Sequence, residues 1–143
     1  MNIRKLFEDY QAGTRHVNSL EMSLIAEYAQ KNSIQYFEPL YRGVNVDMDF
    51  EISLNDTVKF TADSFSEAYN TAKEFAINKP FGVIYEIEEG KGFPLFEMTD
   101  NDDEYEWLIF GEYEVVSIEK ERNPRSEFGW LKIVTLKAKE KVE

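Results

Sequence analysis

The spacing of apolar residues differs between the first 31 residues and the rest of the chain, and this difference limits the folds that the chain can adopt. Apolar residues recur at helical spacing over residues 3–31, with a break around Gly13. The pattern predicts two amphipathic helices, of which the second begins near Asn18 or Ser19 and ends near Asn32. Beyond these helices the sequence is rich in strand-forming segments.

The strand-forming segments are short, and turn residues separate them. Two of the separating turns are expected over residues 88–94 and at Gly111. The predicted strands cover residues 40–44, 57–61, 81–87, 104–110, 112–118 and 130–136.

One further helix is expected after the second predicted strand, and Ser64 or Ser66 can cap its first turn. This order of elements predicts an α+β fold: a mixed, mainly antiparallel sheet of about five to seven strands, with the N-terminal helices packed on one side. The apolar positions of the further helix are Ala68, Tyr69, Ala72, Phe75 and Ala76.

At 143 residues the chain has the size of one ordinary domain with its own core. We therefore expect a single domain over residues 1–143, with a helical part over 1–33, a core over about 40–136 and a frayed tail over 137–143.

The absence of cysteine excludes disulfides, thiolate zinc sites and a cysteine nucleophile, and makes the cytoplasm the expected location. Charges at Arg4, Lys5, Glu8 and Asp9 leave the first ten residues without the apolar core of a signal peptide. No later segment has the length of a membrane span, so we expect no membrane partner. The net charge of −12, from 28 acidic and 16 basic residues, also makes direct binding of nucleic acid unfavourable.

Several familiar catalytic and metal sites are missing from the sequence. It has neither a glycine-rich phosphate loop nor a Gly-x-Ser-x-Gly elbow, and its only histidine, His16, is expected to be a surface or packing residue. The acidic run over residues 100–104 does not fit a calcium loop, because Tyr105 stands where glycine is needed and Gly111 where glutamate is needed. We expect a solvated acidic loop there and no metal ion.

Two carboxylates, Glu104 and Glu106, begin one of the expected strands. Residues two apart in a strand face the same side, so both carboxylates project from one surface while Tyr105 and Trp107 face the other. The same spacing recurs elsewhere in the sequence, for example at Glu86/Glu88 and Glu112/Glu114, and half-exposed strands produce it routinely. The spacing alone is therefore weak support for a reaction centre.

Arg42 lies in an otherwise apolar expected strand, where a lone cation is costly unless it meets an anion. A guanidinium presents paired donors that suit both carboxylate and phosphate. A structural salt bridge and a contact with the pyrophosphate of a dinucleotide are both open. The residues alone slightly favour the salt bridge.

Three short motifs follow one another along the chain: Tyr-Arg-Gly at residues 41–43, Phe-Thr-Ala-Asp-Ser-Phe-Ser at 60–66 and Glu-Tyr-Glu-Trp-Leu at 104–108. In this order they resemble the ADP-ribosyltransferases that use an Arg, a Ser and a Glu, the R-S-E type. The resemblance covers about residues 40–118, and the short chain resembles a compact, phage-encoded member of that family, which would act in the host cytoplasm. Ala62 departs from the family, because it stands where a Ser-Thr-Ser run begins.

The resemblance implies a mono-ADP-ribosyltransferase that uses NAD as co-substrate, needs no metal ion and modifies an arginine of a target protein. It implies that Arg42, Gly43, Ser64, Phe65 and Glu106 bind NAD in a cleft. The diphosphate would lie near Arg42, and the nicotinamide against the backbone of Gly43 and the ring of Phe65.

The catalytic residues implied by the resemblance are Arg42, Ser64, Glu104 and Glu106. Ser64 would orient the two glutamates, and Glu106 would stabilise the positive charge that develops on the ribose. Glu104 would orient or deprotonate the acceptor guanidinium, and a glutamate at this position is typical of arginine-specific members.

Two other functions remain open on the sequence. The acidic charge is compatible with a non-catalytic binding protein, such as a host-factor inhibitor or a nucleic-acid mimic. Ala62 supports a degenerate transferase fold that binds NAD or a peptide without turnover.

Overall fold

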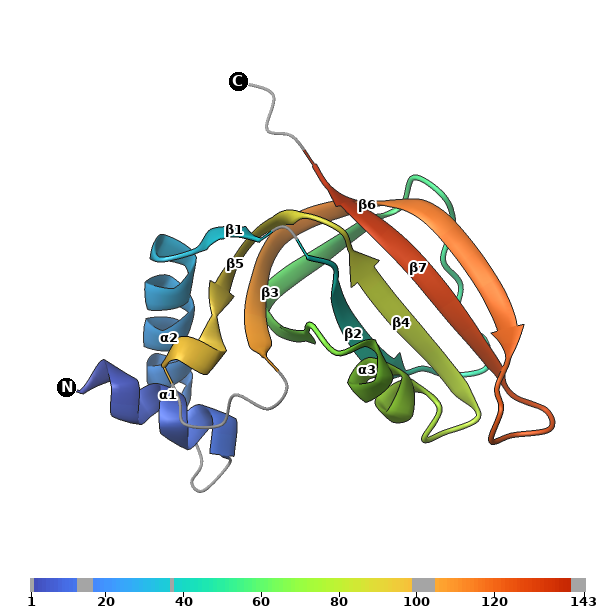
Figure 1. The fold of residues 1–143 in the computed structure, drawn as a ribbon, viewed down its shortest axis with the longest axis horizontal. Coiled ribbons are helices and arrows are strands. Elements are labelled where there is room, and N and C mark those ends of the chain that lie inside the picture. Colours follow the sequence, from blue (N-terminus) through green and yellow to red (C-terminus); the bar gives the residue numbers. More distant parts are fainter. Residues whose placement is uncertain (1, 13–16, 37, 99–104, 140–143) are drawn as a thin grey trace.

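The computed structural model describes residues 2–12, 17–36, 38–98 and 105–139. In chain order the elements are α1 (Ile3–Ala12), α2 (Ser19–Lys31), β1 (Ile34–Tyr36), β2 (Leu40–Asn45), β3 (Thr57–Ser66), α3 (Tyr69–Ala76), β4 (Phe81–Ile87), β5 (Gly90–Pro94), the 3₁₀ helix η1 (Leu95–Glu97), β6 (Glu106–Arg122) and β7 (Trp130–Ala138). The helices α1 and α2 lie at one end of a long, curved sheet, and α3 lies apart from them against the strands β2 and β4 (Figure 1).

The seven strands form one sheet in the order β1-β5-β6-β3-β2-β4-β7. The β4–β7 pair is parallel, and the other pairs are antiparallel. The long strand β6 pairs with β5 and β3 through its first half and with β7 through its second half. The strands from β6 through β3, β2 and β4 to β7 therefore close into a ring. The α+β class and the mainly antiparallel sheet are confirmed.

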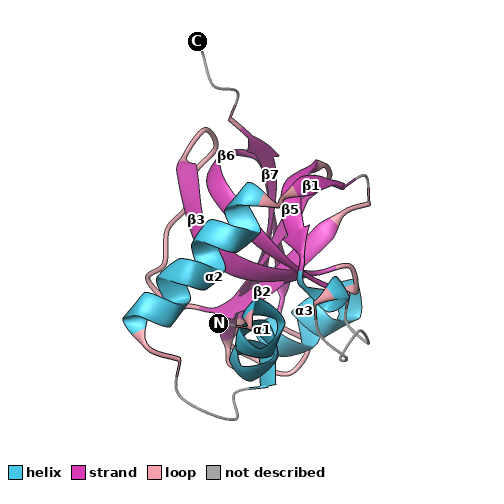
Figure 2. Cartoon of the chain, turned by 90° about the vertical axis from the view of Figure 1, so that its left-hand side faces the viewer, coloured by secondary structure: helices cyan, strands magenta, loops and turns pink. Residues whose placement is uncertain are grey.

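The two N-terminal helices pack beside β5 on one side of the sheet, as expected (Figure 2). Asn18 caps α2, because its side chain accepts a hydrogen bond from the amide of Glu21 while the Glu21 side chain accepts one from the amide of Asn18. The helix ends at Asn32, its C-cap, so both expected ends are confirmed. None of the helices in the described part of the chain has the length and apolar character needed to cross a membrane.

The third helix lies against β2 and β4, where two glycines make room for its backbone (Figure 1). A Cβ atom on Gly43 would lie 1.9 Å from the carbonyl oxygen of Ala72, and one on Gly82 would lie 2.0 Å from that of Ala76. Both distances are far below van der Waals contact. The glycines therefore set how closely α3 approaches the sheet.

The start of α3 differs from the prediction. Its N-cap is Ala68, whereas Ser64 and Ser66 lie within β3, which is five residues longer than the predicted segment over 57–61. Ser66 still assists the connection, because its hydroxyl accepts a hydrogen bond from the amide of Ala68 at 3.0 Å. The strand continues beyond residue 61 because a β-bulge at Ala62 shifts the register by one residue, after which the strand again pairs with β6.

Other strand boundaries also differ. The predicted turn over 88–94 contains β5, and the short strand β1 was not predicted. No turn occurs at Gly111, where β6 continues with a φ of 101°. The strand β7 extends to Ala138, so the first residues of the predicted tail over 137–143 are part of the sheet.

Ala62 adopts a φ of 119°, a conformation that costs a residue with a Cβ atom about 1–3 kcal/mol. Glycine adopts it without this cost. We expect Ala62→Gly to raise the free energy of unfolding by about 1 kcal/mol, measured by urea denaturation. Ala26→Gly is the matched control, because Ala26 lies within α2 and its replacement should lower the same quantity by about 1 kcal/mol. Equal destabilisation by both changes would contradict strain at Ala62.

Candidate functional site

The strands β2 and β3 are neighbours in the sheet but pair at one position, Tyr41 opposite Ser66. Arg42 bridges the two strands next to this pair. Its Nη1 donates to the carbonyl oxygen of Ser64 at 3.0 Å, and its Nη2 lies 3.7 Å from Oδ1 of Asp63. The side chains of Arg42 and Asp63 are 31% and 32% exposed, respectively. The expected salt bridge of Arg42 is thus present, and the guanidinium remains within reach of solvent.

A cavity of about 240 Å³ opens beside Arg42. Arg42, Gly43, Ser64, Phe65 and Glu106 all line it, so three strands bring together the residues that the resemblance implies for NAD binding. Sites for drug-sized ligands usually measure about 300–1,000 Å³, so this cavity suits one end of a dinucleotide rather than the whole of it. Its remaining lining residues are Tyr41, Ser66, Thr71, Ala72 and Phe75.

Glu106 is the first residue of β6 and lies opposite Ser66 of β3. Its position places the carboxylate at the rim of the sheet, half-buried beside the cavity. The Nε2 atom of Gln11, in the last turn of α1, donates a hydrogen bond to Oε2 of Glu106 at 3.1 Å. The N-terminal helix therefore contacts the candidate site directly, and no sequence pattern predicted this contact.

Tyr10 reaches the same place from the same helix. Its side chain lies close to the Ser64 side chain and in the electrostatic field of Glu106, Asp63 and Arg42. Burial raises the pKa of the Tyr10 phenol most, and the negative charge of Glu106 raises that pKa further, whereas Ser64 and Arg42 lower it. The phenol is therefore neutral at physiological pH.

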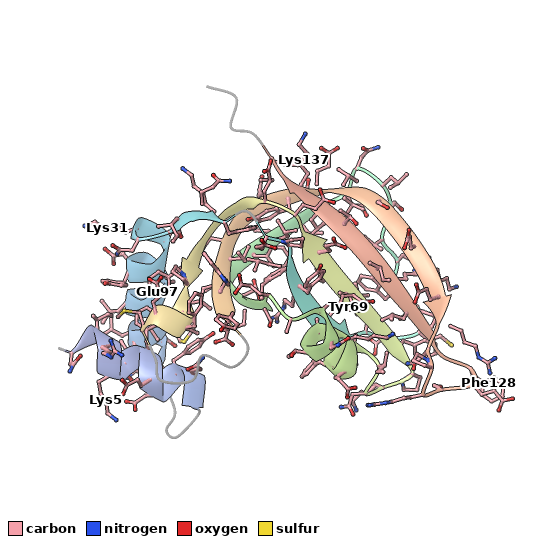
Figure 3. All side chains as sticks on the ribbon, viewed as in Figure 1. Lys5, Lys31, Tyr69, Glu97, Phe128 and Lys137 are labelled. Atoms are coloured by element: carbon pink, nitrogen blue, oxygen red, sulfur yellow. The ribbon has the colours of Figure 1, made fainter. Side chains whose placement is uncertain are left out.

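Phe65 and Phe75 both line the cavity, but their side chains differ in exposure. The side chain of Phe65 is 1% exposed, and its ring packs edge-on against Phe60 at 5.1 Å in the main core. Phe75 of α3 lines the same cavity and is 59% exposed, although it was expected to be a packing residue of the helix. Tyr69 at the start of α3 packs on Tyr41, with ring centroids 5.3 Å apart (Figure 3).

Some predicted features lie outside the described residues. These are Glu104, the acidic run over 100–103 and His16. Within the described ranges, no group of three or more Asp, Glu or His side chains is arranged to hold a metal ion.

The sequence offered no signal for one residue that lines the cavity and for two that contact its lining. Gln11 and Tyr10 belong to a helix that local patterns describe only as amphipathic. Their contacts with Glu106 and Ser64 join segments far apart in the chain, so they depend on how α1 docks. Phe75 occupies an apolar position of α3, and helical periodicity alone cannot separate a buried ring from a ring at a cavity.

No model of a known protein family and no curated protein sequence matches the chain. Solved structures of ADP-ribosyltransferases do match its fold. The ADP-ribosyltransferase Vis in complex with an inhibitor is 15% identical, with a TM-score of 0.70 over 97% of this chain and 73% of that chain. Vis in complex with agmatine is 16% identical, with a TM-score of 0.65 over 98% and 70% of the two chains.

A third similar structure is an ADP-ribosyltransferase from Clostridium botulinum. It is 13% identical, with a TM-score of 0.61 over 95% of this chain and 85% of that chain. The chain therefore has the fold of the ADP-ribosyltransferases.

Proposed function

We propose that this protein is an NAD-dependent mono-ADP-ribosyltransferase, which transfers ADP-ribose from NAD to an arginine of a target protein and releases nicotinamide. One observation carries the proposal. In a chain with this fold, Arg42, Ser64 and Glu106 line the same cavity. Three separate motifs that were identified by their order along the sequence thus meet at one place.

The chemistry of the cavity residues suits each of them to a different part of NAD. The partly exposed guanidinium of Arg42 is suited to the diphosphate, because its contact with Asp63 at 3.7 Å is long and leaves donors available. The exposed ring of Phe75 lines the cavity and would cover the nicotinamide. Breaking the bond between nicotinamide and ribose builds positive charge on the sugar, and the carboxylate of Glu106 would stabilise that charge.

The acceptor is proposed to be a guanidinium. Glu104 precedes Glu106 by two residues, and its carboxylate would orient or deprotonate the incoming nucleophile. A base is needed because a protonated guanidinium is a poor nucleophile. The structure of Vis with agmatine, a small molecule that carries a guanidinium, supports an acceptor of this type.

NAD is expected to stabilise the folded protein, because a ligand that binds only the folded state raises the free energy of unfolding. At a concentration of 100 times Kd the gain is about 2.7 kcal/mol, measurable as a rise in Tm. Incubation with a mixture of target proteins and NAD labelled in the adenylate should then transfer label to a protein. NAD labelled in the nicotinamide is the control, and its label should be released as a free base.

A protein that gains no stability from NAD and releases no nicotinamide is not a transferase, and its acidic charge would then favour a non-catalytic binding function.

A further inference from the structure

The end of helix α1 touches the candidate site with two consecutive side chains. Gln11 donates to the carboxylate of Glu106 at 3.1 Å, across 95 positions of the chain. The phenol of Tyr10 lies close enough to the Ser64 side chain for Ser64 to lower its pKa. Two side chains that line the cavity thus lie next to a helix whose described residues lie outside that lining.

This helix end is firmly anchored. Leu6 is 3% exposed and Phe7 is fully buried. The ring of Phe7 stacks on Phe93 of β5 with centroids 5.1 Å apart, and it meets Tyr28 of α2 edge-on at 5.7 Å. Residues three and four positions apart share one face of a helix, so the face that carries Phe7 also carries Tyr10 and Gln11. The buried ring therefore fixes where these two side chains point.

The chemistry of an amide suits the contact with Glu106. An amide N–H donates to a carboxylate oxygen without carrying a charge, so it stabilises the ionised carboxylate and leaves its negative charge available. Among the described residues, the charged groups that act on the neighbouring Tyr10 phenol are Glu106 of β6, Asp63 of β3 and Arg42 of β2. A hydrogen bond donated to the charged form of a carboxyl group favours that form, and Gln11 supplies such a donor to Glu106.

We propose that Gln11 is a positioning residue of Glu106, whose hydrogen bond fixes the direction of the carboxylate at the cavity. Helix α1 is then a working part of the site and not only a packing element. The catalytic consequence of this inference rests on the proposed function, whereas its effect on the carboxylate can be measured without any turnover.

The test compares Gln11→Leu with wild type and with Gln30→Leu. Gln30 lies exposed on α2, so its replacement makes the same chemical change away from the cavity. The first measurement is the titration of the Glu106 carboxyl carbon by nuclear magnetic resonance, with Glu106→Gln to assign the signal. Because Gln11→Leu removes a donor to the charged form, its midpoint should lie at higher pH than in wild type and Gln30→Leu. An equal midpoint in all three proteins would overturn the inference.

The second measurement is NAD hydrolysis. Gln11→Leu should lower kcat about tenfold to a hundredfold, as expected for a lost hydrogen bond to a charged group, with KM for NAD little changed. The acid limb of its pH profile should move to higher pH. An unchanged kcat and pH profile in an active protein would overturn the inference, whereas a wild type without hydrolysis would contradict only the proposed function.

A second variant keeps the inference testable if Gln11→Leu does not fold. Gln11→Ala places the best helix-forming residue in the last turn of α1, and it removes the same donor. Its titration midpoint and kcat should change in the same direction as those of Gln11→Leu. A folded Gln11→Ala protein with wild-type values in both measurements would again overturn the inference.

Discussion

Glu106→Gln is expected to lower both NAD hydrolysis and ADP-ribose transfer by about a hundredfold to a thousandfold, the effect of removing a fixed electrostatic group from a reaction centre. Both reactions pass through the same positive charge on the ribose, so one substitution should affect both. The amide keeps the size of the side chain and removes its charge. Single-turnover rates of nicotinamide release and of label transfer measure the two losses.

Two further substitutions make this result specific. Glu112→Gln on the exposed part of β6 removes a charge from the same strand and should retain wild-type rates. Glu104→Gln should lower transfer strongly and leave hydrolysis measurable, because water can attack the ribose without help from Glu104. If Glu106→Gln folds and retains full transfer, the carboxylate is only part of an exposed strand. If Glu104→Gln loses both reactions equally, its separate role is wrong.

The largest expected effect on stability is that of Gly43→Ala. The added Cβ atom would lie 1.9 Å from the carbonyl oxygen of Ala72, and a backbone atom cannot turn aside as a flexible side chain can. The helix α3 would have to move away from the sheet. We expect a loss of about 3 kcal/mol in the free energy of unfolding, and a Tm lower by about 10 °C.

Gly111→Ala is the matched control for this experiment. Gly111 has a φ of 101°, but no atom lies within 4 Å of the position that its Cβ would occupy. Its substitution therefore adds backbone strain without a collision, and should cost about 1–2 kcal/mol. Urea denaturation of the two variants separates the effects. If Gly43→Ala costs no more than Gly111→Ala, the close approach of α3 is not what determines the stability at Gly43.

The glycines of β5 show why one part of the fold could not be predicted from the sequence, and the ends of α2 show why another part could. Glycine is typical of turns, because its backbone adopts conformations that other residues avoid. The turn over residues 88–94 was predicted on this basis. Gly90 and Gly92 instead lie within β5, where a Cβ would come within 2.8 Å of the Tyr36 hydroxyl and within 2.7 Å of the Ile109 side chain. Such a requirement arises only from tertiary packing. By contrast, the ends of α2 depend on local capping and were predictable.

The candidate site shows the same division. Arg42, Ser64 and Glu106 belong to short motifs whose order is visible in the sequence, and the structure places them around one cavity. Neither Gln11 nor Phe75 could be identified in this way. The contact of Gln11 with Glu106 and the position of Phe75 at the cavity depend on how α1 and α3 dock, which no local sequence pattern indicates.

The closed order of the strands also determines how the molecule must assemble. Pairing of β4 with β7 joins Phe81 to Trp130, and pairing of β3 with β6 joins Ser66 to Glu106. Contacts between such distant segments require the chain to lose loop-closure entropy before they become favourable, which gives folding times of about milliseconds to seconds. Residues of both β3 and β6 line the cavity, so the cavity cannot form before these two strands have paired. A bound dinucleotide would therefore slow the opening of the native state without speeding its formation.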